Sequence, residues 1–216
     1  MTKPLPTISD IVLIGPMGVG KSTIGKLLAE KLRLRHAELD DVWMEYSKEI
    51  GFDVNHFQEL REKWYSKSVD DIQGDRPEWA RYFMPFLPYQ VECLLSRNRN
   101  VVITLGAGHT VYDDAAEFAR VQTALRPYPN IVLLLPSPDL DISARILQER
   151  IEHDPTRIDQ KGRNWITAIK EKNAYDANDV MLRSRCNFDL ARIIVYTEGK
   201  SPVETRDEIL ARAEGL

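Results

Sequence analysis

The sequence predicts an α/β fold in three layers, a five-stranded parallel sheet with helices on both faces, and two observations support this prediction. Short, nearly continuous apolar segments are typical of parallel strands that are buried on both faces. Segments with a helical apolar period alternate with them, as in layered α/β proteins. The expected strands are Ile11–Ile14, His36–Leu39, Val101–Leu105, Ile131–Leu135 and Ile193–Tyr196, of which the second has the weakest apolar pattern.

Three of the expected helices carry additional signals. After the first strand, an apolar stripe at helical spacing comprises Ile24, Leu27, Leu28 and Leu32. A second stripe follows Ser137–Pro138, which we expect to be the N-cap and first turn, and comprises Leu140, Ala144, Leu147 and Ile151. The pattern Ser201-Pro202-Val203-Glu204 is that of a capping box and predicts the start of the last helix.

Length and composition indicate one domain over residues 1–216. The chain is 43% hydrophobic and 29% charged, with a net charge of −4, as in ordinary globular domains. The small negative charge argues against a nucleic-acid partner. No apolar run approaches the roughly 20 residues of a membrane span, and the first residues lack a signal-peptide core. Cys93 and Cys186 are expected to be reduced thiols, so we expect a cytoplasmic protein without membrane association.

The stretch GPMGVGKST at residues 15–23 contains a complete Walker A pattern, Gly15-x-x-x-x-Gly20-Lys21-Ser22. Glycines let the backbone turn its N–H groups toward phosphate oxygens, and the following helix adds the partial positive charge of its N-terminus. Lys21 can reach the β- and γ-phosphates, and Ser22 can supply a hydroxyl to Mg²⁺. The motif predicts a P-loop NTPase fold that binds ATP and Mg²⁺, with nucleotide contacts from Gly15, Met17, Gly18, Val19, Gly20, Lys21, Ser22 and Thr23.

Two polar segments follow the second and third strands, at the sheet edge where open α/β proteins bind ligands. The segment Glu38-Leu39-Asp40-Asp41 brings carboxylates that can hold Mg²⁺ through water or accept a proton from an attacking hydroxyl. The segment Gly106-Ala107-Gly108 lets a ligand approach the backbone closely. His109 follows it, and we expect this histidine to be a polar loop residue rather than a catalyst.

Two further segments are candidates for covers over such a site. Residues 72–90 hold three prolines and five aromatic residues, within an insertion of about 52–92 that we interpret as a substrate cap. An aromatic cluster that packs on itself is the alternative, and a packed cap can also line a pocket. A basic segment of about 148–165 predicts a lid that brings Arg150 or Arg157 onto the transferring phosphate, and spacing alone does not choose between them.

With these motifs the chain resembles the shikimate kinases, within the P-loop kinases of small molecules and nucleotides. GPMGVGKSTIGKLLAEKL is similar to that family's opening, ELDD at 38–41 falls where the family has a D-x-D pair, and GAG at 106–108 falls where it has a triple glycine that touches substrate. The resemblance implies that Glu38 joins Ser22 at the metal, that Asp40 lies beside the reacting hydroxyl, and that the acceptor contacts Gly106, Ala107 and Gly108. The tail NFDLARIIVYTEGKSPVETRDEIL is similar to the family's last strand and adenine-side loop, which implies that Thr197 and Lys200 lie near the adenine.

The acceptor half of the family pattern is not reproduced. The family holds its substrate's carboxylate with arginines, whereas residues 64–67 read Trp-Tyr-Ser-Lys, residues 170–175 read Lys-Glu-Lys-Asn-Ala-Tyr, and the lid lacks the family's Arg-Pro-Leu. A lysine is a poor replacement for a guanidinium fork. The resemblance therefore implies the fold and the kinase chemistry, but not shikimate as the acceptor.

The sequence favours an ATP-dependent small-molecule kinase that transfers the γ-phosphoryl group to a hydroxyl acceptor, acting as a monomer or homodimer. Lys21, Asp40 and a lid arginine, Arg150 or Arg157, are its expected catalytic residues. Two alternatives stay open. One is a nucleoside or nucleotide kinase, in which Trp79, Tyr82 and Phe83 would stack on a base. The other is a nucleotide-binding regulatory protein with little transferase activity.

Overall fold

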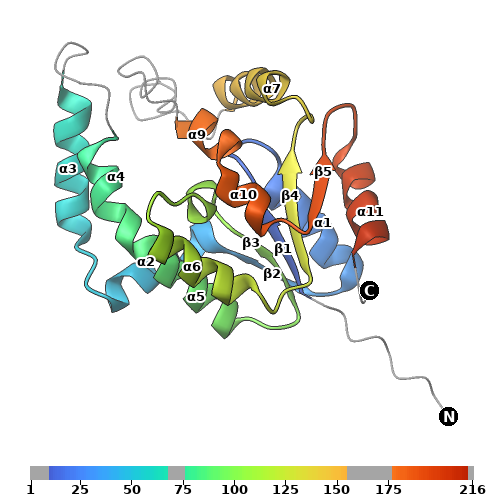
Figure 1. Ribbon diagram of the computed structural model, residues 1–216, viewed down its shortest axis with the longest axis horizontal. Coiled ribbons are helices and arrows are strands. Elements are labelled where there is room, and N and C mark those ends of the chain that lie inside the picture. Colours follow the sequence, from blue (N-terminus) through green and yellow to red (C-terminus); the bar gives the residue numbers. More distant parts are fainter. Residues whose placement is uncertain (1–9, 68–75, 155–176, 214–216) are drawn as a thin grey trace.

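The computed structural model describes residues 10–67, 76–154 and 177–213, and their strands form one parallel sheet (Figure 1). The strand order is β2-β3-β1-β4-β5, which confirms the expected five-stranded sheet. β1 pairs with β3 on one side and β4 on the other, so that Leu13 lies opposite both Thr104 and Val132. The strands are β1 (Ile11–Ile14), β2 (Arg35–Glu38), β3 (Val101–Thr104), β4 (Asn130–Leu135) and β5 (Ile193–Tyr196).

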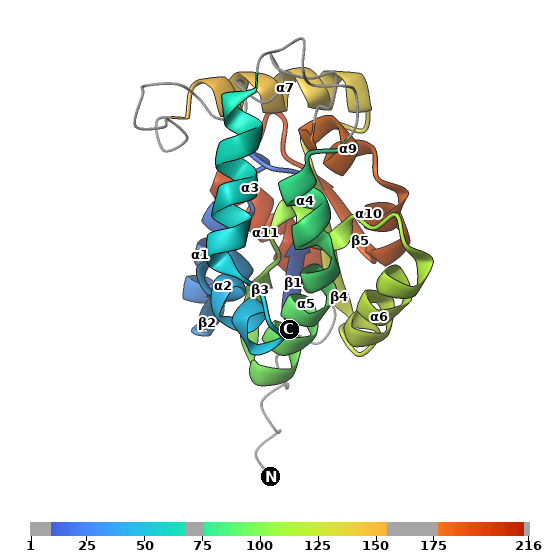
Figure 2. The ribbon, with the colours of Figure 1, turned by 90° about the vertical axis from the view of Figure 1, so that its left-hand side faces the viewer.

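Helices surround the sheet, as the apolar periodicity predicts. α1 and α11 pack together on one side, and α5, α6 and α10 lie on the other (Figures 1 and 2). No helix among the described residues is long and apolar enough to span a membrane. The helices are α1 (Lys21–Leu32), α2 (Leu39–Glu49), α3 (Val54–Ser66), α4 (Glu78–Phe83), α5 (Leu87–Arg97), α6 (Ala115–Leu125), α7 (Leu140–Glu152), α9 (Ala177–Arg183), α10 (Arg185–Leu190) and α11 (Pro202–Arg212), with short 3₁₀ turns η2 (Met84–Phe86) and η3 (Ala107–Thr110).

The second strand is displaced by one residue from its expected position. It runs from Arg35 to Glu38, and Leu39 begins α2 with its side chain fully buried in the core. β2 lies at the edge of the sheet, where a strand needs no continuous apolar run. This position explains why its apolar pattern is weak while β1, β3 and β4 are buried throughout.

The predicted start of α7 is also wrong, and the side chains explain why. The Asp139 carboxylate accepts hydrogen bonds from the backbone N–H groups of Asp141 and Ile142, which makes Asp139 the N-cap. Ser137 instead exchanges two 2.9 Å hydrogen bonds with the Ser143 hydroxyl and is buried. At α11 the predicted capping box of Ser201 and Glu204 is confirmed.

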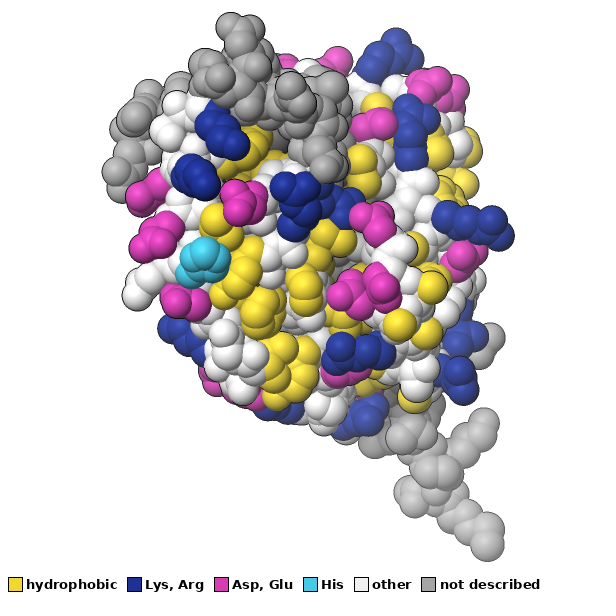
Figure 3. Space-filling view, turned by 60° about the vertical axis from the view of Figure 1, so that its left-hand side comes forward, with side chains coloured by type: hydrophobic (Ala, Val, Ile, Leu, Met, Phe, Trp, Pro, Cys, Tyr) yellow, Lys and Arg dark blue, Asp and Glu magenta, His cyan; other side chains and the backbone are white. Residues whose placement is uncertain are grey.

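The segment expected to form a cap contains α3, α4 and η2, and its aromatic rings pack on one another. Trp43 of α2 lies edge-on to Phe83 at 5.0 Å between ring centroids, and Phe52 lies edge-on to Phe86 at 5.0 Å. Phe57 of α3 contacts both Phe83 and Trp79. Figure 2 shows α3 and α4 side by side, and Figure 3 shows apolar side chains gathered on one face of the molecule. The expectation of a self-packed aromatic cluster is confirmed for the described residues.

Candidate functional site

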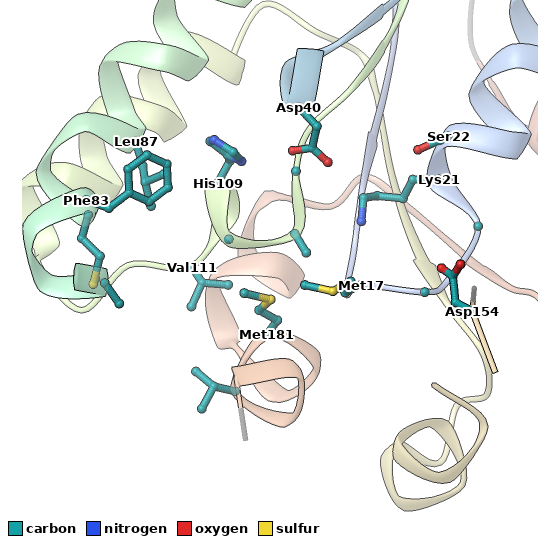
Figure 4. Close-up of a pocket in the computed structure, with 18 of the residues that line it drawn as sticks. Met17, Lys21, Ser22, Asp40, Phe83, Leu87, His109, Val111, Asp154 and Met181 are labelled. Atoms are coloured by element: carbon teal, nitrogen blue, oxygen red, sulfur yellow. The ribbon is translucent and has the colours of Figure 1, made fainter. Parts of the chain in front are cut away.

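A pocket of about 800 Å³ lies at the carboxyl edge of the sheet, where the P-loop, α4 with η2, and α9 meet (Figure 4). Its volume falls within the range of small-molecule sites. The lining side chains and backbone segments come from six parts of the chain: Met17, Gly18, Gly20, Lys21, Ser22 and Thr23; Asp40; Arg76, Trp79, Ala80, Phe83, Met84 and Leu87; Gly106, Ala107, Gly108, His109 and Val111; Arg150 and Asp154; and Val180 and Met181.

The P-loop has the backbone that its glycines permit. Gly15, Gly18 and Gly20 have φ angles of 137°, 79° and 100°. A Cβ on Gly15 would also lie 2.5 Å from the carbonyl oxygen of Leu134, so a larger residue is excluded there on two grounds. The backbone N–H of Met17 donates to the Asn178 side chain over 3.0 Å, which joins the P-loop to α9.

Lys21 and Ser22 begin α1 and place a cation and a hydroxyl at the mouth of this loop. Nζ of Lys21 donates to the carbonyl oxygens of Gly15, at 2.8 Å, and Pro16, at 3.0 Å. The ammonium group is therefore held inside the loop, although its side chain is long and flexible. The Ser22 hydroxyl donates to the Glu38 carboxylate, so the two predicted metal-site residues lie in direct contact.

The donor set at Ser22 and Glu38 fits a magnesium ion. Mg²⁺ prefers oxygen ligands and keeps several waters, with one or two carboxylates and substrate phosphates completing its coordination. Among residues 10–67, 76–154 and 177–213, no group of three or more His, Cys, Asp or Glu could hold a metal by itself. A magnesium ion held by Ser22 and Glu38 would keep several waters and could take phosphate oxygens as further ligands.

Asp40 lies in the first turn of α2 and faces the loop that follows β3. A Cβ on Gly106 would lie 2.4 Å from Oδ1 of Asp40 and 2.5 Å from Nδ1 of His109. The carboxylate and the imidazole thus occupy the space that a side chain at position 106 would need. Figure 4 shows both groups in one part of the pocket, with Lys21 beyond Asp40.

His109 differs from the polar loop residue that we expected. It belongs to the 3₁₀ turn η3, its exposed fraction is 5%, and it lines the pocket. Nε2 lies 2.6 Å from Oε1 of the fully buried Gln90. Burial lowers the pKa of His109 to about 4, so the imidazole is neutral at pH 7.

Most of the predicted site residues meet in this pocket, and a few do not. Gly15 and Val19 lie beneath the P-loop surface, and the Val19 side chain is 2% exposed. Thr197 and Lys200 do not line the pocket; Nζ of Lys200 donates instead to Tyr196 and Glu208. Arg150 of α7 lines the pocket, whereas Arg157 and most of the expected lid fall outside the described residues.

The sequence analysis did not identify Arg76 as a site residue. Arg76 lines the pocket with its side chain 15% exposed, and its guanidinium pairs with Asp113 at 2.6 Å. The residue stands inside the aromatic segment, which we assigned to a cap without choosing a charged residue in it. The available signal was an arginine among the aromatic residues of 72–90, where Arg76 and Arg81 were equal candidates.

Comparisons with known proteins agree with this geometry. A family model described as shikimate kinase matches residues 17–69, which include most of the P-loop and all of α2. A shikimate kinase of Persephonella marina is 28% identical over 203 residues, covering 94% of this chain and 98% of its own. A shikimate kinase of Francisella tularensis subsp. novicida is 32% identical over 100 residues, covering 46% of this chain and 45% of its own.

Solved structures share the fold at low sequence identity. A shikimate kinase from Acinetobacter baumannii in complex with shikimate has a TM-score of 0.56 and 18% identity, covering 95% of this chain and 93% of its own. A gluconokinase from Sinorhizobium meliloti has a TM-score of 0.51 and 16% identity, covering 97% and 92%. These structures show that the chain has their fold. Taken with the P-loop, the family model and the curated relatives support a shikimate kinase-like P-loop kinase, a phosphotransferase with a hydroxyl group as acceptor.

Proposed function

We propose that the chain transfers the γ-phosphoryl group of ATP, as its Mg²⁺ complex, to a hydroxyl group of a small molecule that has a largely apolar body. The observation that carries this proposal is one pocket that joins the P-loop, Asp40 and the aromatic cap. Phosphoryl transfer depends mainly on positioning and electrostatic stabilisation, and the pocket supplies groups for both.

Each group has a role that its position supports. The P-loop amides and Lys21 would bind and stabilise the γ-phosphoryl group, and Ser22, with Glu38 through water, would hold Mg²⁺, which supplies further charge neutralisation when bound. Asp40 would orient the acceptor hydroxyl. As the acceptor oxygen bonds to the γ-phosphorus, the bond from phosphorus to the ADP oxygen breaks and the hydroxyl proton passes to Asp40. Arg150 would offset charge on the transferring group.

The cap defines the chemistry of the acceptor body. The far wall of the pocket is apolar and comprises Trp79, Phe83, Met84, Leu87, Val111 and Met181. A polyol would leave hydroxyl groups unpaired against such a wall, and each unpaired buried group costs about 1–3 kcal/mol. Arg76 is the cation that the cap brings to this wall, so we assign it to an anionic group on the acceptor.

The first experiment measures ADP release by the purified protein with Mg·ATP over a panel of acceptors: shikimate, gluconate, apolar hydroxy acids, sugars, nucleosides and nucleoside monophosphates. An apolar hydroxy acid should give the strongest stimulation. Lys21→Ala should abolish release while the circular dichroism spectrum is retained, because Lys21 acts on phosphate. Normal turnover by this variant would overturn the assignment.

A second experiment tests Arg76. Arg76→Met should raise the KM of an acidic acceptor about tenfold or more, because a charged hydrogen bond contributes roughly 1.5–3 kcal/mol, and it should leave the KM of ATP unchanged. Lys63→Met is the matched control, since Lys63 is an exposed cation of the cap that pairs with Glu78 and does not line the pocket. If Arg76→Met and Lys63→Met changed the KM of the acidic acceptor equally, Arg76 would have no specific role in acceptor binding.

A nucleoside or nucleotide kinase is the second candidate, because two aromatic residues of the cap line the pocket. Trp79 and Phe83 line the pocket and offer ring surfaces to a base, whereas Tyr82 packs against Phe52 and its hydroxyl accepts from the Asp53 backbone. Tight binding of a nucleoside monophosphate, with stimulated ADP release, would favour this candidate over a hydroxy acid.

A further inference from the structure

A buried asparagine attaches the short helix α9 to the P-loop. Oδ1 of Asn178 accepts a 3.0 Å hydrogen bond from the backbone N–H of Met17, although the two residues are 161 positions apart, and Asn178 is 9% exposed. Asparagine is a poor helix former, because its side chain competes for backbone hydrogen bonds. The tertiary contact with Met17, and not local helix preference, therefore explains an asparagine at this position.

The other end of α9 is attached to η3 by buried hydrogen bonds. The last four carbonyl groups of a helix have no partner within it, and in α9 Met181 carries one of them. Nδ2 of Asn187 donates to this carbonyl over 2.7 Å, and Oδ1 of Asn187 accepts from the Thr110 hydroxyl over 2.5 Å. Asn187 and Thr110 are both buried, so water does not replace these partners.

Between these two attachments, α9 presents Val180 and Met181 to the acceptor end of the pocket. A Cβ on Gly108 of η3 would lie 3.6 Å from Cε of Met181, so this methionine packs against η3 at an ordinary contact distance. Figure 4 shows Met17 and Met181 in the same part of the pocket. A methionine side chain is unbranched and flexible, so its backbone must be held in place if the thioether is to form a defined wall.

The position of α9 depends on its tertiary contacts, because a helix of seven residues is not stable by itself in water. Leu182 is buried in the core, and Arg183 pairs with Asp141 of α7 at 2.6 Å. The side chains of this ion pair are 43% and 83% exposed, and exposed ion pairs contribute little to stability. The buried bond from Asn178 is thus the stronger restraint on α9 at its P-loop end.

We infer that Asn178 is a positioning residue for phosphoryl transfer. It holds α9 against the P-loop, and through Met181 it sets where the apolar body of the acceptor lies relative to the γ-phosphoryl group. Asn178 acts through α9, since it is not itself one of the residues that line the pocket. This inference rests on the proposed function and adds a residue to it.

The first test measures the position of α9 without any acceptor. The methionine methyl groups are labelled with carbon-13, and nuclear Overhauser effects are recorded on the free protein. Wild type should show an effect between the Met181 methyl group and the Gly108 Hα that takes the place of Cβ. Asn178→Leu keeps the size of the side chain but removes the bond to Met17, and it should lose this effect. Asp141→Asn is the matched control: it removes the exposed ion pair of α9 and should keep the effect.

Kinetics test the role in turnover, with the hydroxy acid that gives the highest ADP release as acceptor. Asn178→Leu should raise the KM of this acceptor roughly 2–12-fold, the equivalent of one hydrogen bond. The KM of ATP should not change, because Lys21 holds the P-loop through Gly15 and Pro16. In a Met181→Ala background, Asn178→Leu should change the acceptor KM less than about twofold, because the side chain through which it acts is absent.

Hydrogen exchange tests the same bond in wild-type protein, in case Asn178→Leu does not fold. The Met17 amide should exchange about a hundredfold or more slowly than the same amide in an unfolded chain, because its hydrogen bond is to a buried side chain. Exchange at the unfolded rate would overturn the inference.

The outcomes separate the inference from the proposed function. Equal nuclear Overhauser effects in Asn178→Leu and Asp141→Asn, an unchanged acceptor KM, a matching rise in the KM of ATP, or equal effects with and without Met181 would each overturn the role of Asn178. ADP release that depends on Lys21 would still support the kinase in all of these cases. If no acceptor stimulated ADP release, the proposed function would fail, and the spectra and the exchange rate would still decide whether Asn178 holds α9.

Discussion

At Gly106 the pocket has no room for a side chain. We predict that Gly106→Ala lowers kcat/KM at least tenfold, because the new methyl group would lie about 2.5 Å from both Asp40 and His109 and would displace one of them. Gly108→Ala is the matched control: its Cβ would meet Met181 at an ordinary 3.6 Å. Initial rates with saturating Mg·ATP measure both. Equal losses in the two variants would show that Gly106 has no special steric role.

His109 also makes the stability of the fold depend on pH. Burial lowers its pKa from 6.5 to about 4, so the unfolded chain binds a proton at a higher pH than the folded one does. The contribution of His109 to the free energy of unfolding should therefore be complete above pH 6.5, and it should decrease as the pH drops from 6.5 to 4. Burial also lowers the pKa of His36, so this histidine makes stability depend on pH in the same direction.

Urea unfolding at pH 7 and pH 5 measures this dependence. We expect wild-type protein to lose about 2 kcal/mol from the His109 contribution over this interval. In the double variant Gln90→Met/His109→Phe, the free energy of unfolding should drop by about 2 kcal/mol less than in wild type over this interval. The remaining drop should include the contribution of His36. A pH dependence identical to that of wild type would mean that His109 is not buried as a neutral group.

Among the elements, α3 supports the pocket without lining it. Phe57 of α3 is 7% exposed and packs on Trp79 and Phe83, which belong to α4 and line the pocket. Phe57→Leu should destabilise the protein by about 1–2 kcal/mol and raise the KM of the acceptor several-fold, because α4 loses its support. The KM of ATP should not change, since the P-loop is remote from this contact.

The control for this prediction is Phe188→Leu. Phe188 lies on α10, is 37% exposed, and takes no part in the aromatic cluster. It should change neither KM value. If Phe57→Leu also raised the KM of ATP, the substitution would affect nucleotide binding as well as the cap, which would contradict the prediction.

For the whole molecule, the aromatic contacts between α2 and the cap predict one cooperative unfolding transition. Trp43 of α2 packs on Phe52, Phe57 and Phe83, and Phe83 also packs against the core that contains the strands, which joins the cap to the sheet. Mg·ADP at a hundred times its Kd should stabilise the protein by about 2.7 kcal/mol and shift this single transition upward, as calorimetry would show. Lys21→Ala should lose the shift.

Two transitions, only one of them responsive to nucleotide, would instead divide the chain into a cap and a nucleotide-binding unit. The single domain over residues 1–216 stays a prediction until this measurement, and so does the choice between monomer and homodimer. A sedimentation experiment on the same sample decides the oligomeric state.

The sequence by itself determined the sheet and the P-loop. These features depend on local signals: apolar runs of strand length and glycines where the backbone needs positive φ. Glu38 was implied only by the family resemblance, and the sequence left open whether Glu38 or Asp41 lies nearer the metal; in the structure the Ser22 hydroxyl contacts Glu38. Two predicted helix starts are displaced where local signals compete. Leu39 begins α2 because its side chain is buried in the core, and Asp139 caps α7 because its carboxylate accepts the first free N–H groups.

Only the tertiary structure decided the acceptor end of the pocket. Ser47 and Gln90 are 43 residues apart, Gln90 and His109 are 19 apart, and Arg76 meets Asp113 across 37 residues. No periodicity or spacing encodes such contacts, because they depend on how α2, α4 and α5 pack on one another. One short motif predicts nucleotide binding, whereas acceptor recognition depends on side chains that are distant in the sequence and that the fold brings together.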